Sequence, residues 1–188
     1  MRQYPQVKLS LVSGNTERIV EAVAAEKVEL GIIEGPAMRR DVKTERMMRD
    51  EMVLIVSPNH AWAARKVGAI ARKELAQVPL LLRERGSGSR RVVERALKKA
   101  GLPLRSLRVA MELDSTEAII SGVEADLGVG FVSRCAVGKV LRLGSVKVVG
   151  VEGLEILRDF SFVRLAGAEA TGAAAAFQRF AMGSSTSG

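Results

Sequence analysis

The chain has 188 residues, of which 47% are hydrophobic, so it can bury one ordinary core or two small ones. Its formal net charge is +8 and only 4% of its residues are aromatic, which argues against the stacking surface of a single-strand nucleic-acid-binding protein. A single cysteine, Cys135, and a single histidine, His60, exclude an internal disulfide and a Cys/His zinc site. No segment has the apolar length of a signal peptide or a transmembrane helix, so we expect a cytoplasmic location and no membrane partner.

Short apolar runs rich in Val, Ile and Leu alternate with amphipathic segments along the chain. The apolar runs predict strands over residues 7–12, 28–33, 52–56, 79–83, 109–113, 128–132 and 146–151. The amphipathic segments predict helices over residues 16–27, 90–100 and 116–125. Because a parallel strand pair needs a crossover connection, this alternation predicts an α/β chain with mostly parallel sheets.

Four expected strand-to-helix junctions share a small hydroxyl or amide residue: "SGNT" (13–16), "RERGSGS" (83–89), "LDSTE" (113–117) and "FVSR" (131–134). Asp114 and Glu117 have the spacing of a capping box. Helix starts carry unpaired N–H groups and the positive end of the helix dipole, which suit anions. Each junction alone can be an ordinary cap, but together they indicate a site to which Arg83 or Arg90 adds charge, unless these arginines are only solvated.

Nucleotide-binding and hydrolase motifs do not match, because the residues they require are missing at the necessary positions. "GSGSRR" has Arg91 where a dinucleotide-binding loop needs its third glycine, and no phosphate-loop lysine or G-x-S-x-G elbow is present. His60 is interpreted as a loop histidine and Cys135 as a buried packing residue. We therefore expect no catalytic residue, no metal ligand and no cofactor.

The order of several blocks resembles the effector-binding (substrate-binding) domain of LysR-type transcriptional regulators. The blocks are "YPQVKLSLVSGNTERIVEAVAAEKVELGIIEGP", "MVLIVSPNHAWA", "LAQVPLLLRERGSGSRRVVERALKKAG", "MELDSTEAIISGVEADLGVGFVSRCAV" and "VEGLEILRDFSFV", which together cover roughly residues 4–180. The resemblance implies two Rossmann-like α/β subdomains joined by two crossover strands, as in type 2 periplasmic binding proteins, with an effector in the cleft between them.

The resemblance also implies domain limits and a site. Subdomain I would contain residues 1–76 and 156–182, and subdomain II residues 77–155. The small, polar composition of residues 183–188 separately predicts a disordered tail. The effector would be a small, often anionic molecule or an inorganic anion. Its expected contacts are Ser13, Asn15, Thr16, Arg83, Ser87, Ser89, Ser115, Thr116 and Ser133. The expected assembly is a homodimer through this domain and a higher oligomer in the full-length regulator.

Two departures from the family pattern stand out. The helix-turn-helix that binds DNA in the family would precede this region, so DNA binding is expected only through that absent domain. The first strand and helix of subdomain I also precede the "YP" block in the family. Competing readings are a transporter's solute-binding protein lacking its signal peptide, a dehydratase of the prephenate type, whose Thr-Arg-Phe motif is absent, and a basic nucleic-acid-binding module.

Overall fold

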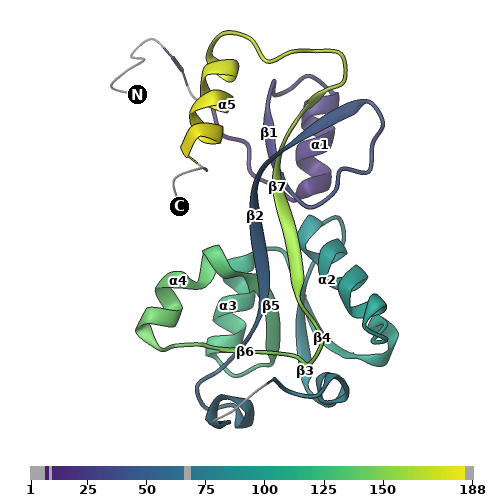
Figure 1. The fold of residues 1–188 in the computed structure, drawn as a ribbon, viewed down its shortest axis with the longest axis vertical. Coiled ribbons are helices and arrows are strands. Elements are labelled where there is room, and N and C mark those ends of the chain that lie inside the picture. The colour runs from purple at the N-terminus through teal and green to yellow at the C-terminus, as the bar shows by residue number, and fades with distance from the viewer. Residues whose placement is uncertain (1–6, 9, 66–68, 185–188) are drawn as a thin grey trace. The chain divides into compact units, whose positions relative to one another are not determined.

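Two compact units make up the chain, and each is described by itself. The computed structural model describes residues 7–184, apart from residue 9 and residues 66–68. Unit 1 contains Met1–Met48 and Asp159–Gly188, and unit 2 contains Arg49–Arg158. Two strands, β2 (Val42–Val56) and β7 (Ile156–Leu165), run from one unit into the other (Figure 1). They are the two crossover strands that the resemblance implies.

Unit 1 contains one end of a seven-stranded sheet, in which β7 and β2 are neighbours. Its other elements are α1 (Thr16–Ala24), β1 (Gly31–Glu34) and α5 (Gly172–Ser184). β1 pairs antiparallel with β7, in a register that places Gly31 opposite Val163. The apolar face of α1 packs on this pair, and its core contains Ile19, Val20, Val23, Ile33 and Val163. A side chain at position 31 would meet this packing, because a Cβ there would lie 2.6 Å from Ile19 Cγ2.

Unit 2 contains the larger, mixed part of the sheet, with the strand order β7-β2-β5-β3-β4 and β6 paired to β2. Its strands besides β2 and β7 are β3 (Pro79–Arg83), β4 (Arg108–Leu113), β5 (Val129–Ser133) and β6 (Lys147–Val149). Its helices are α2 (Gly88–Lys99), α3 (Thr116–Glu124) and α4 (Arg134–Leu143), with short 3-10 turns at Ala61–Ala64, Arg72–Gln77 and Leu104–Ser106. β3 pairs parallel with β4 and with β5, whereas β2 pairs antiparallel with β5 and with β6.

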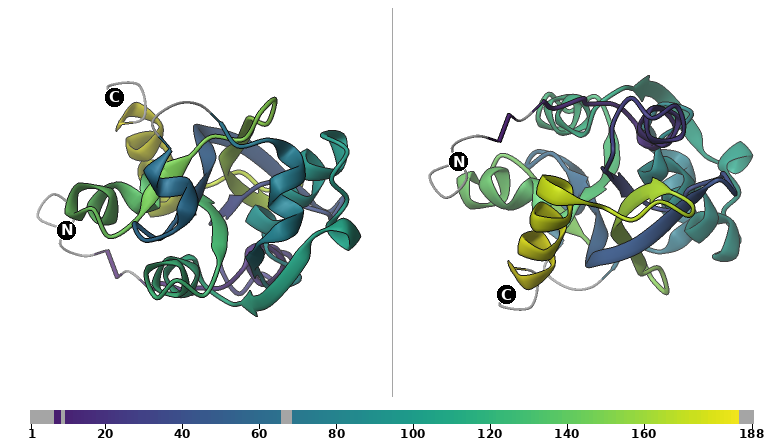
Figure 2. Two further views of the ribbon diagram at one scale, coloured as in Figure 1. Left: turned by 90° about the horizontal axis from the view of Figure 1, so that it is seen from below. Right: turned by 90° about the horizontal axis from the view of Figure 1, so that it is seen from above.

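The sheet of unit 2 is buried on both faces, because successive residues of its strands point to opposite sides. Leu80 and Leu82 of β3 belong to one core together with Val93 and Leu97 of α2. Leu81, between them, belongs to a second core with residues of α3 and α4. The helices therefore form layers on both sides of the sheet, as Figure 2 also shows.

The main elements follow the predicted alternation, with particular differences. Residues 7, 8 and 10–12 form no strand, and β1 pairs only with β7 among the described residues. β2 extends far beyond the predicted 52–56, and the sheets are mixed rather than mostly parallel. The units divide at 48/49 and 158/159, so residues 49–76 and 156–158, expected in subdomain I, lie in unit 2, where Trp62, Ile70 and Leu75 join its core.

Several local predictions need correction. The cap of α3 is Ser115, not Asp114, because Ser115 Oγ accepts a hydrogen bond from the Ala118 N–H. Residues 183 and 184, placed in a disordered tail by the sequence, belong to α5, and residues 185–188 lie outside the described residues. Cys135, expected to be buried, is exposed. His60 does lie in a loop, where its Nδ1 accepts from the Trp62 N–H.

Candidate functional site

Three helices of unit 2 begin on one edge of its sheet. β3, β4 and β5 are parallel, so their carboxyl ends meet at the same edge, and α2, α3 and α4 respectively follow these ends. We call this the junction edge: the ends of β3, β4 and β5 and the starts of α2, α3 and α4. Ligands of open α/β sheets bind outside the carboxyl ends of strands. The positive ends of three helix dipoles meet there, which favours negative charge.

The three helix starts differ in how their serines are used. Ser87 caps α2, since its Oγ accepts from the Arg90 N–H at 3.4 Å, and Ser115 caps α3 at 3.0 Å from the Ala118 N–H. Ser133 precedes α4 but makes no side-chain capping bond. Ser87 and Ser133 are both buried. The α4 start is therefore the one of the three that lacks a hydroxyl cap.

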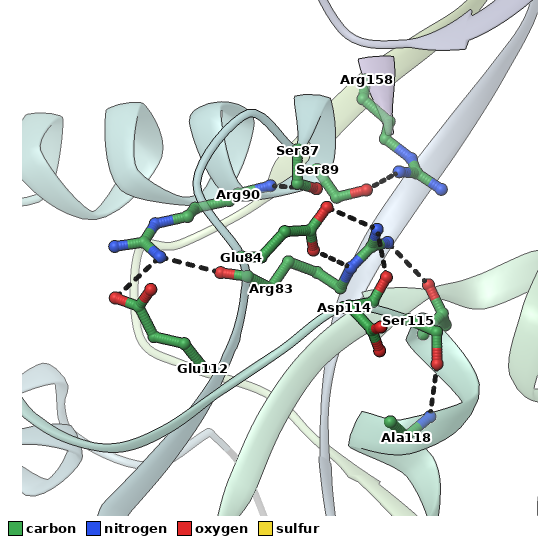
Figure 3. A network of polar contacts seen from close by, with 11 residues as sticks. Arg83, Glu84, Ser87, Ser89, Arg90, Glu112, Asp114, Ser115, Ala118 and Arg158 are labelled. Atoms are coloured by element: carbon green, nitrogen blue, oxygen red, sulfur yellow. Dashed lines mark hydrogen bonds and ion pairs between the residues drawn. The ribbon is translucent and has the colours of Figure 1, made fainter. Parts of the chain in front are cut away.

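The Arg83 guanidinium joins the end of β3 to the start of α3 (Figure 3). Its Nε donates to Glu84 at 2.9 Å, and its two terminal nitrogens donate to Thr116 Oγ1 at 3.3 Å and to the Asp114 carbonyl at 3.1 Å. Glu84 neutralises its charge. Arg83 and Thr116, both predicted site residues, thus lie together at the junction edge and bind each other.

Arg90 is a buried structural arginine. Its Nε donates to Glu94 at 2.6 Å, and its Nη1 contacts both the Arg83 carbonyl and Glu112, each at 2.9 Å (Figure 3). Burial alone lowers the pKa of Arg90, but the bonds to Glu94 and Glu112 outweigh burial, so the pKa is raised and the charge is permanent. Two carboxylates balance this charge. Arg90 therefore holds the first turn of α2 against β3 and β4.

A buried ion pair lies beside α2. Arg158 of β7 donates from Nε to Asp50 Oδ2 of β2 at 2.7 Å, and both side chains are 1% exposed. Arg158 Nη1 donates to Ser89 Oγ, in the first turn of α2, at 2.6 Å. Burial by itself raises the pKa of Asp50. The hydrogen bond from Arg158 and the nearby Ser133 and Cys135 side chains lower the pKa by more than burial raises it, so Asp50 is ionised at neutral pH.

Asp50 and Ser133 each keep one buried polar atom without a hydrogen-bond partner. Among the residues that the structure describes, no hydrogen-bond partner reaches Asp50 Oδ1 or Ser133 Oγ. Cys135, in the first turn of α4, lies beside them. Although the residue is exposed, partial desolvation of its thiol raises the pKa of Cys135, and the neighbouring Asp50 carboxylate raises it further. Asp50 and Arg158 were not predicted as site residues, because two charges 108 residues apart become partners only through strand pairing.

The other predicted residues belong to unit 1. Ser13 is exposed, Asn15 caps α1 by accepting from the Arg18 N–H at 3.0 Å, and the buried Thr16 donates to the Glu34 carbonyl at 3.0 Å. Their role toward an effector stays a prediction. No group of three or more His, Cys, Asp or Glu side chains suited to a metal ion occurs within the described ranges.

The fold is similar to that of several solved regulatory domains. The regulatory domain of CcmR from Synechocystis PCC6803, solved in complex with 2-PG, superposes with a TM-score of 0.87 at 22% identity, covering 99% of this chain and 87% of that one. The effector-binding domain of QuiR, solved with shikimate, gives a TM-score of 0.83 at 20% identity, covering 98% and 84%. The fold is thus that of the effector-binding domains of LysR-type regulators, which resemble type 2 periplasmic binding proteins.

Sequence comparison gives the family. Residues 1–184 match the family model of the LysR substrate binding domain, so the chain belongs to this family. The HTH-type transcriptional regulator YeiE of Escherichia coli K12, itself described as uncharacterized, is 34% identical over 155 residues, which are 82% of this chain and 51% of YeiE. CbbR of Xanthobacter flavus is 32% identical over 163 residues, 87% of this chain and 48% of CbbR.

Two further findings concern the kind of protein to which the chain is similar. The chain spans about half the length of the curated relatives it matches. These relatives and the structural neighbours are transcriptional regulators and their domains, not enzymes. Among the helices described, none combines the length and the apolar character needed to cross a membrane.

Proposed function

We propose that the chain is the effector-sensing domain of a LysR-type transcriptional regulator and that the junction edge of unit 2 binds a small anionic molecule. The observation that carries the proposal is the meeting of three helix starts at the ends of three parallel strands. Such an edge offers backbone N–H groups and positive dipole ends to a ligand. The net charge of +8 favours the approach of an anion.

The ion pairs at the edge refine how an anion would be held. Glu84 neutralises Arg83, while Glu94 and Glu112 neutralise Arg90. A bound anion would therefore depend on the N–H groups of the α2 and α3 starts more than on these two guanidinium groups. The residues proposed to surround it are those at the junction edge: Arg83, Ser87, Ser89, Ser115, Thr116 and Ser133.

The relatives suggest how binding would be used. YeiE and CbbR are HTH-type regulators about twice as long as the matched region, and the CcmR and QuiR domains were solved with small molecules. We propose that the full-length regulator acts in the cytoplasm, binds DNA outside this domain and dimerises through it. An effector would shift this domain between two states only if it binds one of them more tightly.

Calorimetric titration tests the proposal. The chain is titrated with sulfate, phosphate, acetate, succinate, malate and glycerate, and saturable binding of at least one is expected. The Ser87→Asp variant should lose this binding, because aspartate is as good a helix cap as serine but adds a negative charge to the junction edge.

A matched control uses the same substitution elsewhere. Ser106 is exposed and lies just before the amino end of β4, at the opposite end of that strand from the junction edge. Ser106→Asp should bind like the unmodified chain. Equal loss in both variants, or the absence of binding by every anion tested, would contradict the proposal.

A further inference from the structure

The start of α4 differs from the starts of α2 and α3 in charge and in hydrogen bonding. The antiparallel register of β2 and β5 ends with Met52 opposite Ser133, and just beyond it the Asp50 side chain interacts with Cys135 in the first turn of α4. A carboxylate therefore lies against the first turn of α4. Its neighbour Glu51 pairs with Arg134, so the two segments stay close beyond the last strand pair.

Two buried atoms at the α4 start have unused hydrogen-bonding capacity. Asp50 Oδ2 is occupied by Arg158, whereas Asp50 Oδ1 and Ser133 Oγ have no partner in the described part of the chain. The side chains are more than nine-tenths buried, at 4% and 5% exposure for the two residues. Buried polar atoms without partners are uncommon in native proteins, and a ligand is one way in which they acquire partners.

The chemistry of these atoms limits what can bind them. An ionised carboxylate oxygen only accepts hydrogen bonds, so a partner of Asp50 Oδ1 must donate one. Sulfate has no hydrogen to donate, and every oxyanion, hydrogen phosphate included, is repelled by the carboxylate. A neutral hydroxyl satisfies both atoms, because it donates to Asp50 Oδ1 and accepts from the Ser133 hydroxyl.

We infer that the α4 start is a subsite for a neutral hydroxyl of the effector, and that the effector is a small hydroxylated acid rather than a simple inorganic anion. This inference rests on the proposed function, in which the acidic group lies toward the α2 and α3 starts. The exposed Cys135 lies beside Asp50 and Ser133, at the margin of this subsite.

Matched pairs of acids test the inference. Glycolate is compared with acetate, glycerate with propionate, and malate with succinate by calorimetric titration of the chain. Hydrogen bonds to charged groups are among the strong ones, so the hydroxylated member of a binding pair should bind at least about tenfold more tightly. Ser133→Ala should reduce this preference to less than about threefold, and it should fold because the lost hydroxyl has no partner.

A second readout uses the single cysteine of the chain. Bound glycerate or malate should slow the alkylation of Cys135 by iodoacetamide at least about threefold, while propionate or succinate at the same concentration should not. Both acids of a pair protecting equally and binding with equal affinity would overturn the inference and leave the proposed function intact. Failure of every acid and inorganic anion to bind would instead overturn the proposed function itself, and the inference with it.

Discussion

Arg158 Nε lies 2.7 Å from Asp50 Oδ2, and this ion pair joins the two strands that run between the units at a point where both side chains are 1% exposed. A buried pair gains less from attraction than its geometry suggests, because both charges have lost their water. Removing one partner is costly all the same, since the remaining charge stays buried without compensation.

Arg158→Ala is therefore expected to lower the free energy of unfolding by about 3–5 kcal/mol, because it leaves the Asp50 carboxylate buried without its counter-charge. The measurement is urea denaturation at pH 7. Arg39→Ala is the matched control, since Arg39 pairs with Asp41 on the surface and its removal should leave the urea midpoint almost unchanged. Equal effects of the two substitutions would contradict the role given to Arg158.

The same pair predicts acid sensitivity. The folded pKa of Asp50 lies below its ordinary value of 3.8, so its contribution to stability is complete above that value and is lost as the pH falls through the lowered pKa. Between pH 5 and pH 2.5, the unmodified chain should lose more stability than Asp50→Asn, whose side chain does not titrate. If the urea midpoints of the two proteins changed with pH in parallel, the pKa of Asp50 would not be lowered in the folded state.

Ser89 and Ser133 are both buried serines, but we expect their replacement by alanine to affect stability differently. Ser89→Ala removes the acceptor of an Arg158 N–H and should cost about 1–3 kcal/mol of unfolding free energy. Ser133→Ala removes a hydroxyl with no partner and should be neutral or slightly stabilising. Thermal denaturation decides between them, and a clear destabilisation by Ser133→Ala would indicate that its hydroxyl is already bonded within the free protein.

Two glycines test the packing of unit 2. A Cβ at Gly128 would lie 2.6 Å from the Pro79 carbonyl oxygen, which is backbone and cannot swing aside, so Gly128→Ala should cost about 1–3 kcal/mol. Gly138 lies inside α4, where a Cβ would lie 3.7 Å from Arg142 Nη1, the flexible end of a side chain. Gly138→Ala should stabilise by about 0.5–1 kcal/mol, since alanine loses less backbone entropy in a helix. The reverse order in urea midpoints would disagree with this packing.

The sequence predicted the buried elements best. β3 has the predicted bounds of 79–83, because an apolar run buried on both faces is visible without knowing its neighbours. The first half of β2 escaped detection, since its polar and charged residues carry no period of two while the strand is largely exposed. The alanine-rich α5 lacks a marked apolar stripe and was missed as well.

Some residues of the candidate site could be predicted from the sequence and others could not. The serines at the helix starts were found because capping residues lie next to the helix they begin. The role of Arg83 and Arg90 depended on distant carboxylates and carbonyls, so the sequence left open whether they faced a ligand or solvent. Asp50 and Arg158 could not be recognised at all, because their pairing depends on strand register and burial rather than on any local pattern.

The most direct test of the account is a ¹⁵N–¹H NMR titration of the chain with glycerate, malate, sulfate and phosphate. We predict saturable shifts, with at least one of these ligands, centred on the backbone amides where α2, α3 and α4 begin: Gly88, Ser89, Thr116 and Cys135. Saturable shifts that leave these amides unmoved and gather elsewhere, or no saturable shift with any of the four, would contradict it.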